Sequence, residues 1–108
     1  MNAIITNDQV KCDKALGALY HVIDPEIGLN VVDLGLIYQI DFDEGNRIIS
    51  VSMTLTSQFC PMGDSIRYSA VSAIQQAFPE YSIDIDLVFN PLWSPERISE
   101  QGQKFLNN

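Results

Sequence analysis

The stretch GLIYQIDFDEGNRIISVSMTLT, residues 35–56, decides the fold that the sequence predicts. Apolar residues alternate with more polar ones along Gly35–Phe42 and again along Arg47–Thr56, which is the period of a half-buried β-strand. The residues DEGN at 43–46 lie between the two runs and have the composition of a turn. The stretch therefore predicts a β-hairpin. The side chains expected on its covered face are Leu36, Tyr38, Ile40 and Phe42 in the first strand and Ile49, Val51, Met53 and Leu55 in the second.

Helices and a third strand surround the hairpin in the sequence. A helical spacing of apolar residues predicts one helix over Asp8–Ile23 and a longer one over Met62–Phe78, each followed by a proline. Strand-like alternation returns at Tyr81–Phe89. The tripeptide Ser94-Pro95-Glu96 then offers an N-cap and a first-turn proline for a short last helix.

These elements give an α+β fold in the order α-β-β-α-β-α. Each predicted strand has one mostly polar face, so we expect a two-layer sandwich. Its three-stranded sheet carries the helices on one face and is largely open on the other.

Composition restricts the possible functions of the chain. A length of 108 residues favours a single domain. The net charge of −8 and the lack of any basic run argue against nucleic-acid binding. No apolar run is long enough to span a bilayer, and the first residues do not resemble a signal peptide. Two cysteines are too few for a disulfide scaffold, so we expect a reduced, cytoplasmic protein without a membrane partner.

The segment TSQFCPMGDS, residues 56–65, places a cysteine where a helix should begin. Pro61 suits the first helical turn, which makes Cys60 the expected N-cap. Helix N-termini favour thiolate over thiol, and thiolate is the form that binds metals and attacks electrophiles. Thr56 and Ser57 add hydroxyl groups nearby. The alternative is that Cys60 is a passive capping residue. Cys12, in contrast, lies on the apolar stripe of the first helix and is expected to be a core thiol.

A second candidate segment is DPEIGLNVVDLGLI, residues 24–37. Asp24, Glu26 and Asp33 put three carboxylates into one short connection, where they could bind a cation, receive a proton or contact a partner. The alternative is a local structural role, in which Asp24 ends a helix and Asp33 caps a turn. Further along, Trp93 is expected to be a packing anchor.

Three stretches together resemble the metal–sulfur cluster biosynthetic family that contains SufT and PaaD, whose domain is shared with the eukaryotic cytosolic iron–sulfur targeting factors. They are DPEIGLNVVDLGLIY at 24–38, MTLTSQFCPM at 53–62 and NPLWSPERIS at 90–99. The resemblance covers about residues 10–103 and implies one domain over residues 1–108, with a fold like other iron–sulfur assembly domains.

The resemblance also implies a site. The reactive cysteine of the family corresponds to Cys60, and its acidic motif corresponds to Asp24, Glu26 and Asp33. Phe59 stands where the family pattern often has glycine. The chain lacks the additional C-terminal cysteines expected of PaaD-type proteins, which favours the SufT-like group.

The leading hypothesis is an accessory factor in iron–sulfur cluster assembly or delivery, and not an enzyme. Its partners would be the assembly machinery and client apoproteins, and its cofactor would be iron or a transient iron–sulfur cluster, otherwise none. Two cysteines cannot supply four thiolates, so Cys60 from two subunits, or additional ligands from a client, would be needed. We therefore expect a homodimer or client complex in which Cys60 and the Asp24–Asp33 loop share one surface.

Other functional hypotheses remain open at this stage. The chain could be a non-catalytic protein-binding adaptor in which Cys60 is structural. It could also be an assembly subunit of a PaaD-like oxygenase system. A thiol-dependent enzyme is the least favoured alternative.

Overall fold

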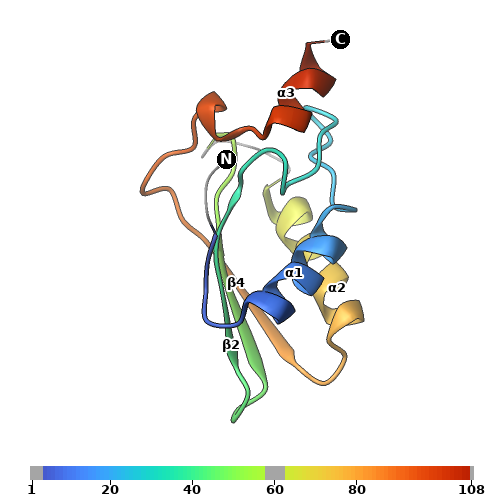
Figure 1. Ribbon diagram of the computed structural model, residues 1–108, viewed down its shortest axis with the longest axis vertical. Helices are drawn as coiled ribbons and strands as arrows, with labels where there is room; N and C mark the ends of the chain where they lie inside the picture. Colours follow the sequence, from blue (N-terminus) through green and yellow to red (C-terminus); the bar gives the residue numbers. More distant parts are fainter. Residues whose placement is uncertain (1–3, 58–62, 108) are drawn as a thin grey trace.

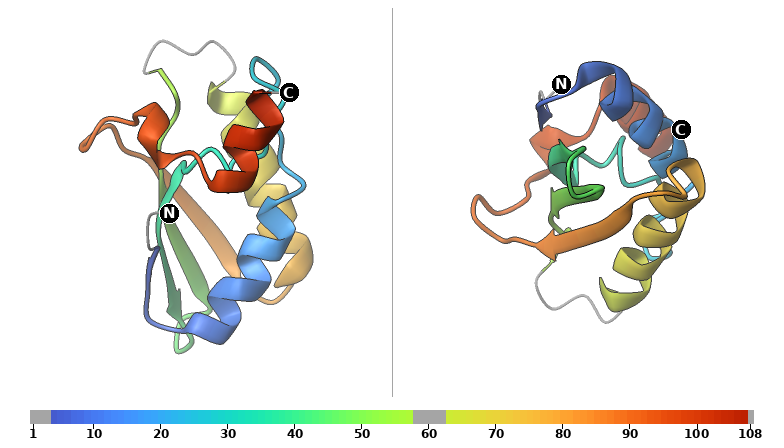
Figure 2. Two further views of the ribbon diagram at one scale, coloured as in Figure 1. Left: turned by 45° about the horizontal axis from the view of Figure 1, so that its top comes forward. Right: turned by 90° about the horizontal axis from the view of Figure 1, so that it is seen from below.

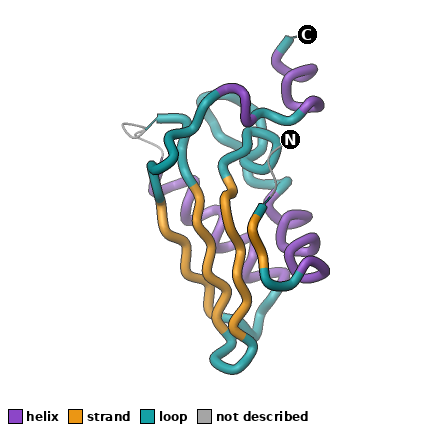
Figure 3. Tube along the Cα trace, turned by 60° about the vertical axis from the view of Figure 1, so that its left-hand side comes forward, coloured by secondary structure: helices purple, strands orange, loops and turns teal. Residues whose placement is uncertain are grey.

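A mixed four-stranded sheet with two helices packed on one face forms the body of the molecule (Figure 1). The computed structural model describes residues 4–57 and 63–107. Its elements are, in chain order, β1 (Ile5–Thr6), α1 (Gln9–Leu19), β2 (Ile37–Asp43), β3 (Ile48–Met53), α2 (Gly63–Ala77), β4 (Ser82–Leu87), the 3-10 helix η1 (Pro95–Arg97) and α3 (Glu100–Leu106). The strand order is β1-β2-β3-β4. In Figure 3, α1 and α2 lie behind the sheet, and no helix of the described residues covers its front face.

The predicted hairpin is confirmed, and β4 lies within the predicted strand Tyr81–Phe89. β2 and β3 pair antiparallel, with Phe42 opposite Ile49, and β4 pairs parallel to β3. Val51 and Ile85 are partners in neighbouring strands and are both 2% exposed. The apolar residues of β3 therefore lie on the face covered by the helices, as their period of two predicts.

The prediction of a three-stranded sheet is wrong, because residues near the N-terminus form a fourth strand. Ile5 and Thr6 pair in parallel with Gln39 and Ile40 of β2. The Asn7 side chain continues this pairing, since its amide donates to the Phe42 carbonyl and accepts from the Phe42 N–H, both at 2.9 Å. Two paired residues are too few to give a periodic signal in the sequence.

The expected placement of Tyr38 on the covered face is also wrong. The pairing register shifts between Ile37 and Gln39, which oppose Met53 and Ser52 respectively. Tyr38 is therefore an additional residue on its strand, as in a β-bulge. The bulge lets Ile37, which is 5% exposed, join the covered face.

The first helix is shorter than predicted. α1 ends at Leu19, and its buried residues are Cys12, Ala15 and Leu19. Ile23 was expected on the buried stripe, but it is 49% exposed and forms a β-bridge with Asn30. The chain leaves the helix because its backbone pairs instead across the following loop.

The remaining helices agree with the sequence in part. α2 buries Ile66, Ala70 and Ile74 against the sheet, while the predicted start at Met62 lies outside the described residues. The Ser94-Pro95 signal begins only one turn of 3-10 helix, and Ser99 then caps α3. Within the described part of the chain, no helix has the length and apolar character needed to cross a membrane.

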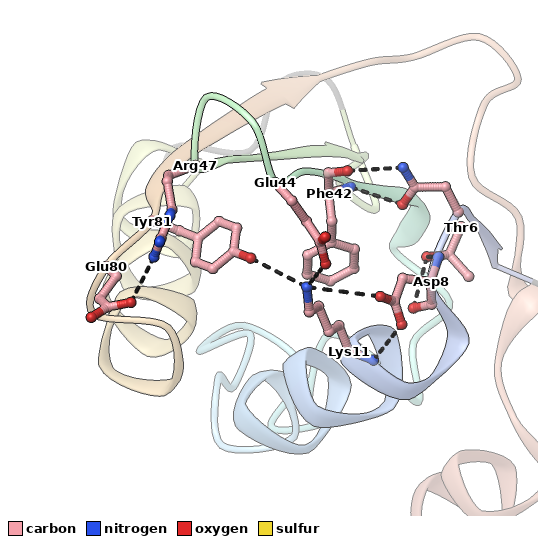
Figure 4. Close-up of polar contacts among 9 residues, drawn as sticks. Thr6, Asp8, Lys11, Phe42, Glu44, Arg47, Glu80 and Tyr81 are labelled. Atoms are coloured by element: carbon pink, nitrogen blue, oxygen red, sulfur yellow. Dashed lines mark hydrogen bonds and ion pairs between the residues drawn. The ribbon is translucent and has the colours of Figure 1, made fainter.

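Lys11 ties α1 to the hairpin end of the sheet (Figure 4). Its ammonium group contacts the carboxylate of Glu44, lies 3.9 Å from Asp8, and donates to the Tyr81 hydroxyl at 3.3 Å. The hydrogen bond with Glu44 raises the pKa of Lys11. Because such surface pairs are screened by solvent, they orient the elements more than they stabilise the fold.

Candidate functional site

Parts of all three motif stretches meet at the end of the sheet opposite the hairpin turn. The Thr54 N–H donates to the Leu36 carbonyl, and the Val88 N–H donates to the Met53 carbonyl, both at 2.8 Å. The entry to β2 and the exits of β3 and β4 are therefore neighbours. The left view in Figure 2 shows η1 and α3 at this same end.

Asp24 is buried and organises the turn that follows α1. It is 1% exposed, and its Oδ1 accepts from the Glu26 N–H at 2.9 Å. Its carbonyl oxygen accepts from the N–H groups of Ile27 and Gly28 at 3.2 and 2.7 Å. Gly28 has a φ of 84°, a conformation that glycine adopts at no steric cost. The Asp24 side chain thus shapes the loop from within, whereas Glu26 is exposed on its surface.

Asp33 connects this loop to the C-terminal helix. Its Oδ2 accepts from the Asn30 side-chain amide at 2.7 Å, and its Oδ1 accepts from the Ser99 hydroxyl at 2.8 Å. The Ser99 N–H also donates to the Asp33 carbonyl at 2.8 Å. Ser99 Oγ in turn accepts from the Gly102 N–H at 3.0 Å and so caps α3. Both carboxylate oxygens of Asp33 therefore have protein partners.

Residues 90–99, here called the C-terminal strap, cross the start of β2. The Trp93 indole N–H donates to the Leu34 carbonyl at 2.6 Å. The Tyr38 hydroxyl donates to the Pro91 carbonyl at 2.9 Å. Trp93 also packs against the hydrophobic core, so it is the packing anchor expected from the sequence. The strap thereby brings the first and third motif stretches into contact.

Gly35 allows the strap to approach the chain closely. It has a φ of 76°, and a Cβ at this position would lie 2.4 Å from the Arg97 carbonyl oxygen. Only a residue without a side chain fits so near another backbone. Arg97, in turn, places its guanidinium 4.3 Å from the centre of the Tyr38 ring.

The cysteine segment is described only on its flanks. Thr56 is half-buried and Ser57 is exposed, both after the end of β3, whereas Cys60 lies outside the described residues. On the other side, Gly63 begins the described part of α2, and a Cβ there would lie 2.8 Å from Leu55 Cδ1. The close neighbour of the first helical turn is thus a leucine side chain. The N-cap position of Cys60, and its sharing a surface with Asp33, remain predictions.

The second cysteine has the environment of a core residue. Cys12 is completely buried in α1, and burial raises the pKa of its thiol. A buried neutral thiol is neither a good nucleophile nor a ready metal ligand. This confirms the expectation for Cys12.

Sequence reasoning missed three residues at this end of the sheet. Ser99 and Arg97 act through contacts with residues distant in the chain, which local spacing does not reveal. The sequence placed the N-cap of the last helix at Ser94, whereas Ser99 caps α3. Thr54 was also overlooked, although its hydroxyl is the one buried side-chain polar atom among the described residues without a hydrogen-bond partner. The sequence pointed instead to Thr56 and Ser57, which are closer to Cys60.

The described residues do not assemble a metal site by themselves. Across 4–57 and 63–107, no three His, Cys, Asp or Glu side chains are grouped so that they could hold a metal ion. In particular, Asp24 and Asp33 are engaged in the local hydrogen bonds given above. What the arrangement does offer is a hydrogen-bonded frame on both sides of the cysteine segment.

Comparison with known proteins agrees with this arrangement. Residues 13–85 match the model of a family described as iron-sulfur cluster assembly protein. The chain is similar to the Fe-S protein maturation auxiliary factor YitW of Bacillus subtilis (strain 168), at 34% identity over 84% of this chain and 88% of the relative. It is also similar to the Fe-S protein maturation auxiliary factor SufT of Staphylococcus aureus (strain USA300), at 38% identity over 76% of this chain and 92% of the relative.

Solved structures show the same fold. A domain of unknown function from Bacillus anthracis superposes with a TM-score of 0.85 at 36% identity, covering 92% of this chain and 93% of that one. A conserved hypothetical protein from Thermotoga maritima superposes with a TM-score of 0.75 at 35% identity over the full length of both chains. The family model spans more than half of the chain, and both relatives exceed 30% identity over most of it. The chain therefore belongs to the iron-sulfur cluster assembly protein family.

Proposed function

We propose that this protein is a cytoplasmic accessory factor that assembles iron–sulfur clusters or delivers them to client proteins, without catalysing a reaction. One observation carries the proposal: the described parts of the three family stretches are joined at one end of the sheet. The hydrogen bond between Asp33 and Ser99 and the one between Thr54 and Leu36 are examples of these links. The names of the relatives, which are maturation auxiliary factors, support the same role.

In this proposal Cys60 is the residue that binds iron or the cluster. The chain has two cysteines, and the buried Cys12 is not available as a ligand. One thiolate cannot hold a cluster, for which four cysteine ligands are usual. The remaining ligands would come from Cys60 of a second subunit or from the client, so the cluster is a cargo that is held briefly between two chains.

The acidic residues have different roles in this proposal. Asp24 and Asp33 shape the surface through their internal hydrogen bonds. Glu26 is exposed on the same loop and would contact a partner protein. Thr56 and Ser57 would support the cysteine segment from the end of β3.

Anaerobic reconstitution tests the role of Cys60. The parent protein, Cys60→Ser and the matched control Cys12→Ala would each be treated with ferrous iron and sulfide. We expect visible absorption of a cluster and a dimer mass in the parent and in Cys12→Ala, and neither in Cys60→Ser. A cluster that survives in Cys60→Ser would overturn the ligand assignment.

An adaptor role is the second candidate, and the open face of the sheet favours it. Asp84 and Asp86 of β4 are exposed on that face, and Asp41 of β2 lies in the same cross-strand row as Asp84, with Ser50 between them. Such a surface could dock a basic client. If client maturation in cells proceeded normally with Cys60→Ser but failed with Asp84→Asn/Asp86→Asn, the adaptor role would replace the cluster-binding role.

A further inference from the structure

Arg97 differs from the other two arginines of the chain in its partners. The Arg47 guanidinium pairs with Glu80 at 2.7 Å, and that of Arg67 donates to the Ile85 carbonyl at 3.1 Å. Among the described residues, the guanidinium of Arg97 has no carboxylate within ion-pair distance and no hydrogen-bond acceptor. It is also half-buried, which restricts its contact with water. Its N–H donors are therefore available to a ligand.

Several contacts hold this guanidinium in place. It stacks over the Tyr38 ring at 4.3 Å, and the Tyr38 hydroxyl is itself fixed by the Pro91 carbonyl. The backbone of Arg97 packs directly on Gly35, where a side chain would clash. An arginine fixed in this way loses little side-chain freedom when it binds an anion.

A cavity of about 360 Å³ opens beside the stacked pair on the uncovered side of the sheet. Its lining combines apolar residues with a few polar ones. They are Ile5, Ile37, Tyr38, Gln39, Ser52, Val88, Asn90, Pro91 and Arg97. Arg97 is the one charged residue in the lining. The side-chain amide of Gln39 already donates a hydrogen bond to Asp41 at 2.6 Å.

We propose that this cavity binds a carboxylate attached to an apolar group, with the carboxylate on Arg97 and the apolar part against Ile5, Val88 and Pro91. A guanidinium presents two parallel N–H groups that match the two oxygens of a carboxylate. A single positive charge balances a monoanion. A phosphate would bring more negative charge close to the Asp41 and Asp86 carboxylates of the same face, and it would gain nothing from the apolar walls.

The proposal does not depend on Cys60 or on cluster binding. The cavity is lined by residues of β1, β2, β3 and the C-terminal strap and by Val88, which follows β4, and all of them are described. Cys60→Ser should therefore leave carboxylate binding unchanged. Failure of one proposal can thus be distinguished from failure of the other.

Binding can be measured by NMR titration of the folded chain. Hexanoate would serve as the free acid and N-acetyl-leucine as the end of a polypeptide, with hexanamide and N-acetyl-leucinamide as their neutral counterparts. We expect saturable shifts of the Arg97 side-chain N–H and of the Ser52 and Val88 amides with the acids only. The tighter of the two acids would identify the source of the carboxylate.

Variants test the role of Arg97 directly. Arg97→Gln should weaken binding by about tenfold or more, because it removes a charged hydrogen-bond donor pair. Arg97→Lys should restore only part of the affinity, and Arg67→Gln is the control that should retain all of it. Ser52→Leu fills the cavity while leaving Arg97 in place, so it should also abolish binding. Each variant would first be checked for an unchanged unfolding temperature.

Four results would overturn the proposal. They are equal binding of the amides, tighter binding of inorganic phosphate than of hexanoate, unchanged affinity in Arg97→Gln, and the absence of saturable shifts with both acids.

Discussion

The Ser99 hydroxyl donates a 2.8 Å hydrogen bond to Asp33 Oδ1 across a sequence separation of 66 residues. The same serine caps α3 through the Gly102 N–H. The acidic loop and the C-terminal helix are therefore fixed to each other by one pair of side chains.

We expect this pair to be energetically coupled. Ser99→Ala should reduce the free energy of unfolding by about 1–2 kcal/mol, because it removes an N-cap as well as the bond to Asp33. In a double-mutant cycle with Asp33→Ala, the coupling should be about 1 kcal/mol. Urea denaturation would measure both, with Ser82→Ala, an exposed serine of β4, as the control. Additive effects would mean that the bond contributes nothing to stability.

Two glycines should respond in opposite directions to alanine. At Gly35 the φ is 76°, and a Cβ would lie 2.4 Å from the Arg97 carbonyl oxygen, so there is no room for a methyl group. Gly35→Ala should therefore lower the free energy of unfolding by about 3 kcal/mol. Gly17 lies in the exposed middle of α1 with nothing within 4 Å of its Cβ position. Gly17→Ala should therefore stabilise the protein by about 1 kcal/mol. Thermal unfolding of the two variants would measure both changes. A small loss of stability in Gly35→Ala would show that the C-terminal strap can move away from residue 35.

Cys12 should be protected from alkylation in the folded protein. In the Cys60→Ser background it is the only thiol, and its complete burial predicts modification by iodoacetamide only at the rate of unfolding. Urea should accelerate the reaction strongly. Rapid modification without urea would contradict the burial of this side chain.

The Cys12 thiol should make the stability of the folded protein depend on pH. Because burial raises the pKa of Cys12 above its ordinary value of 9.0, the unfolded chain loses this proton at a lower pH than the folded chain does. The contribution to stability is therefore complete below pH 9.0 and declines as pH rises toward the folded pKa. Comparing urea denaturation of the parent and Cys12→Ala between neutral and alkaline pH should show a steeper loss of stability with rising pH in the parent. Equal slopes in the two proteins would contradict the contribution of Cys12.

The substitution Thr54→Val should make the protein more stable. Its buried hydroxyl lacks a partner among the described residues, and an unsatisfied buried polar group is costly. Replacement by a methyl group of similar shape should raise the free energy of unfolding by about 1 kcal/mol. Thr56→Val, at a half-buried position, is the control that should show no gain. A loss of stability in Thr54→Val would show that the hydroxyl is bonded in the folded protein.

The sequence predicted those elements whose side chains alternate between core and solvent. β3 and β4 have a clear period of two, and α2 has a regular apolar stripe, so tertiary packing reinforces their local pattern. β1 could not be predicted, because two residues have no period and the Asn7 amide does part of the pairing. The bulge at Tyr38 could not be predicted either. One additional residue changes which side chains of a strand face the core, but it leaves the composition of the strand the same.

For the candidate site, the sequence identified the participating stretches but not their contacts. Asp33 was recognised as part of an acidic motif, yet its bond to Ser99 depends on how the chain folds back. The same is true of Arg97 on Tyr38. Contacts between residues that are distant in the sequence cannot be predicted from the local spacing of residue types.

The C-terminal strap has a consequence for the order in which the structure can open. Its contacts with residues 33–38 close a loop that contains most of the chain, whereas the β2–β3 hairpin closes a short one. Long loops have a larger entropic cost of closure, and regions held by few hydrogen bonds open without global unfolding. The Ser99 N–H should therefore exchange with deuterium faster than the amides that pair β2 with β3. The end of the molecule that carries the family motifs can thus rearrange its backbone while the rest of the sheet stays folded.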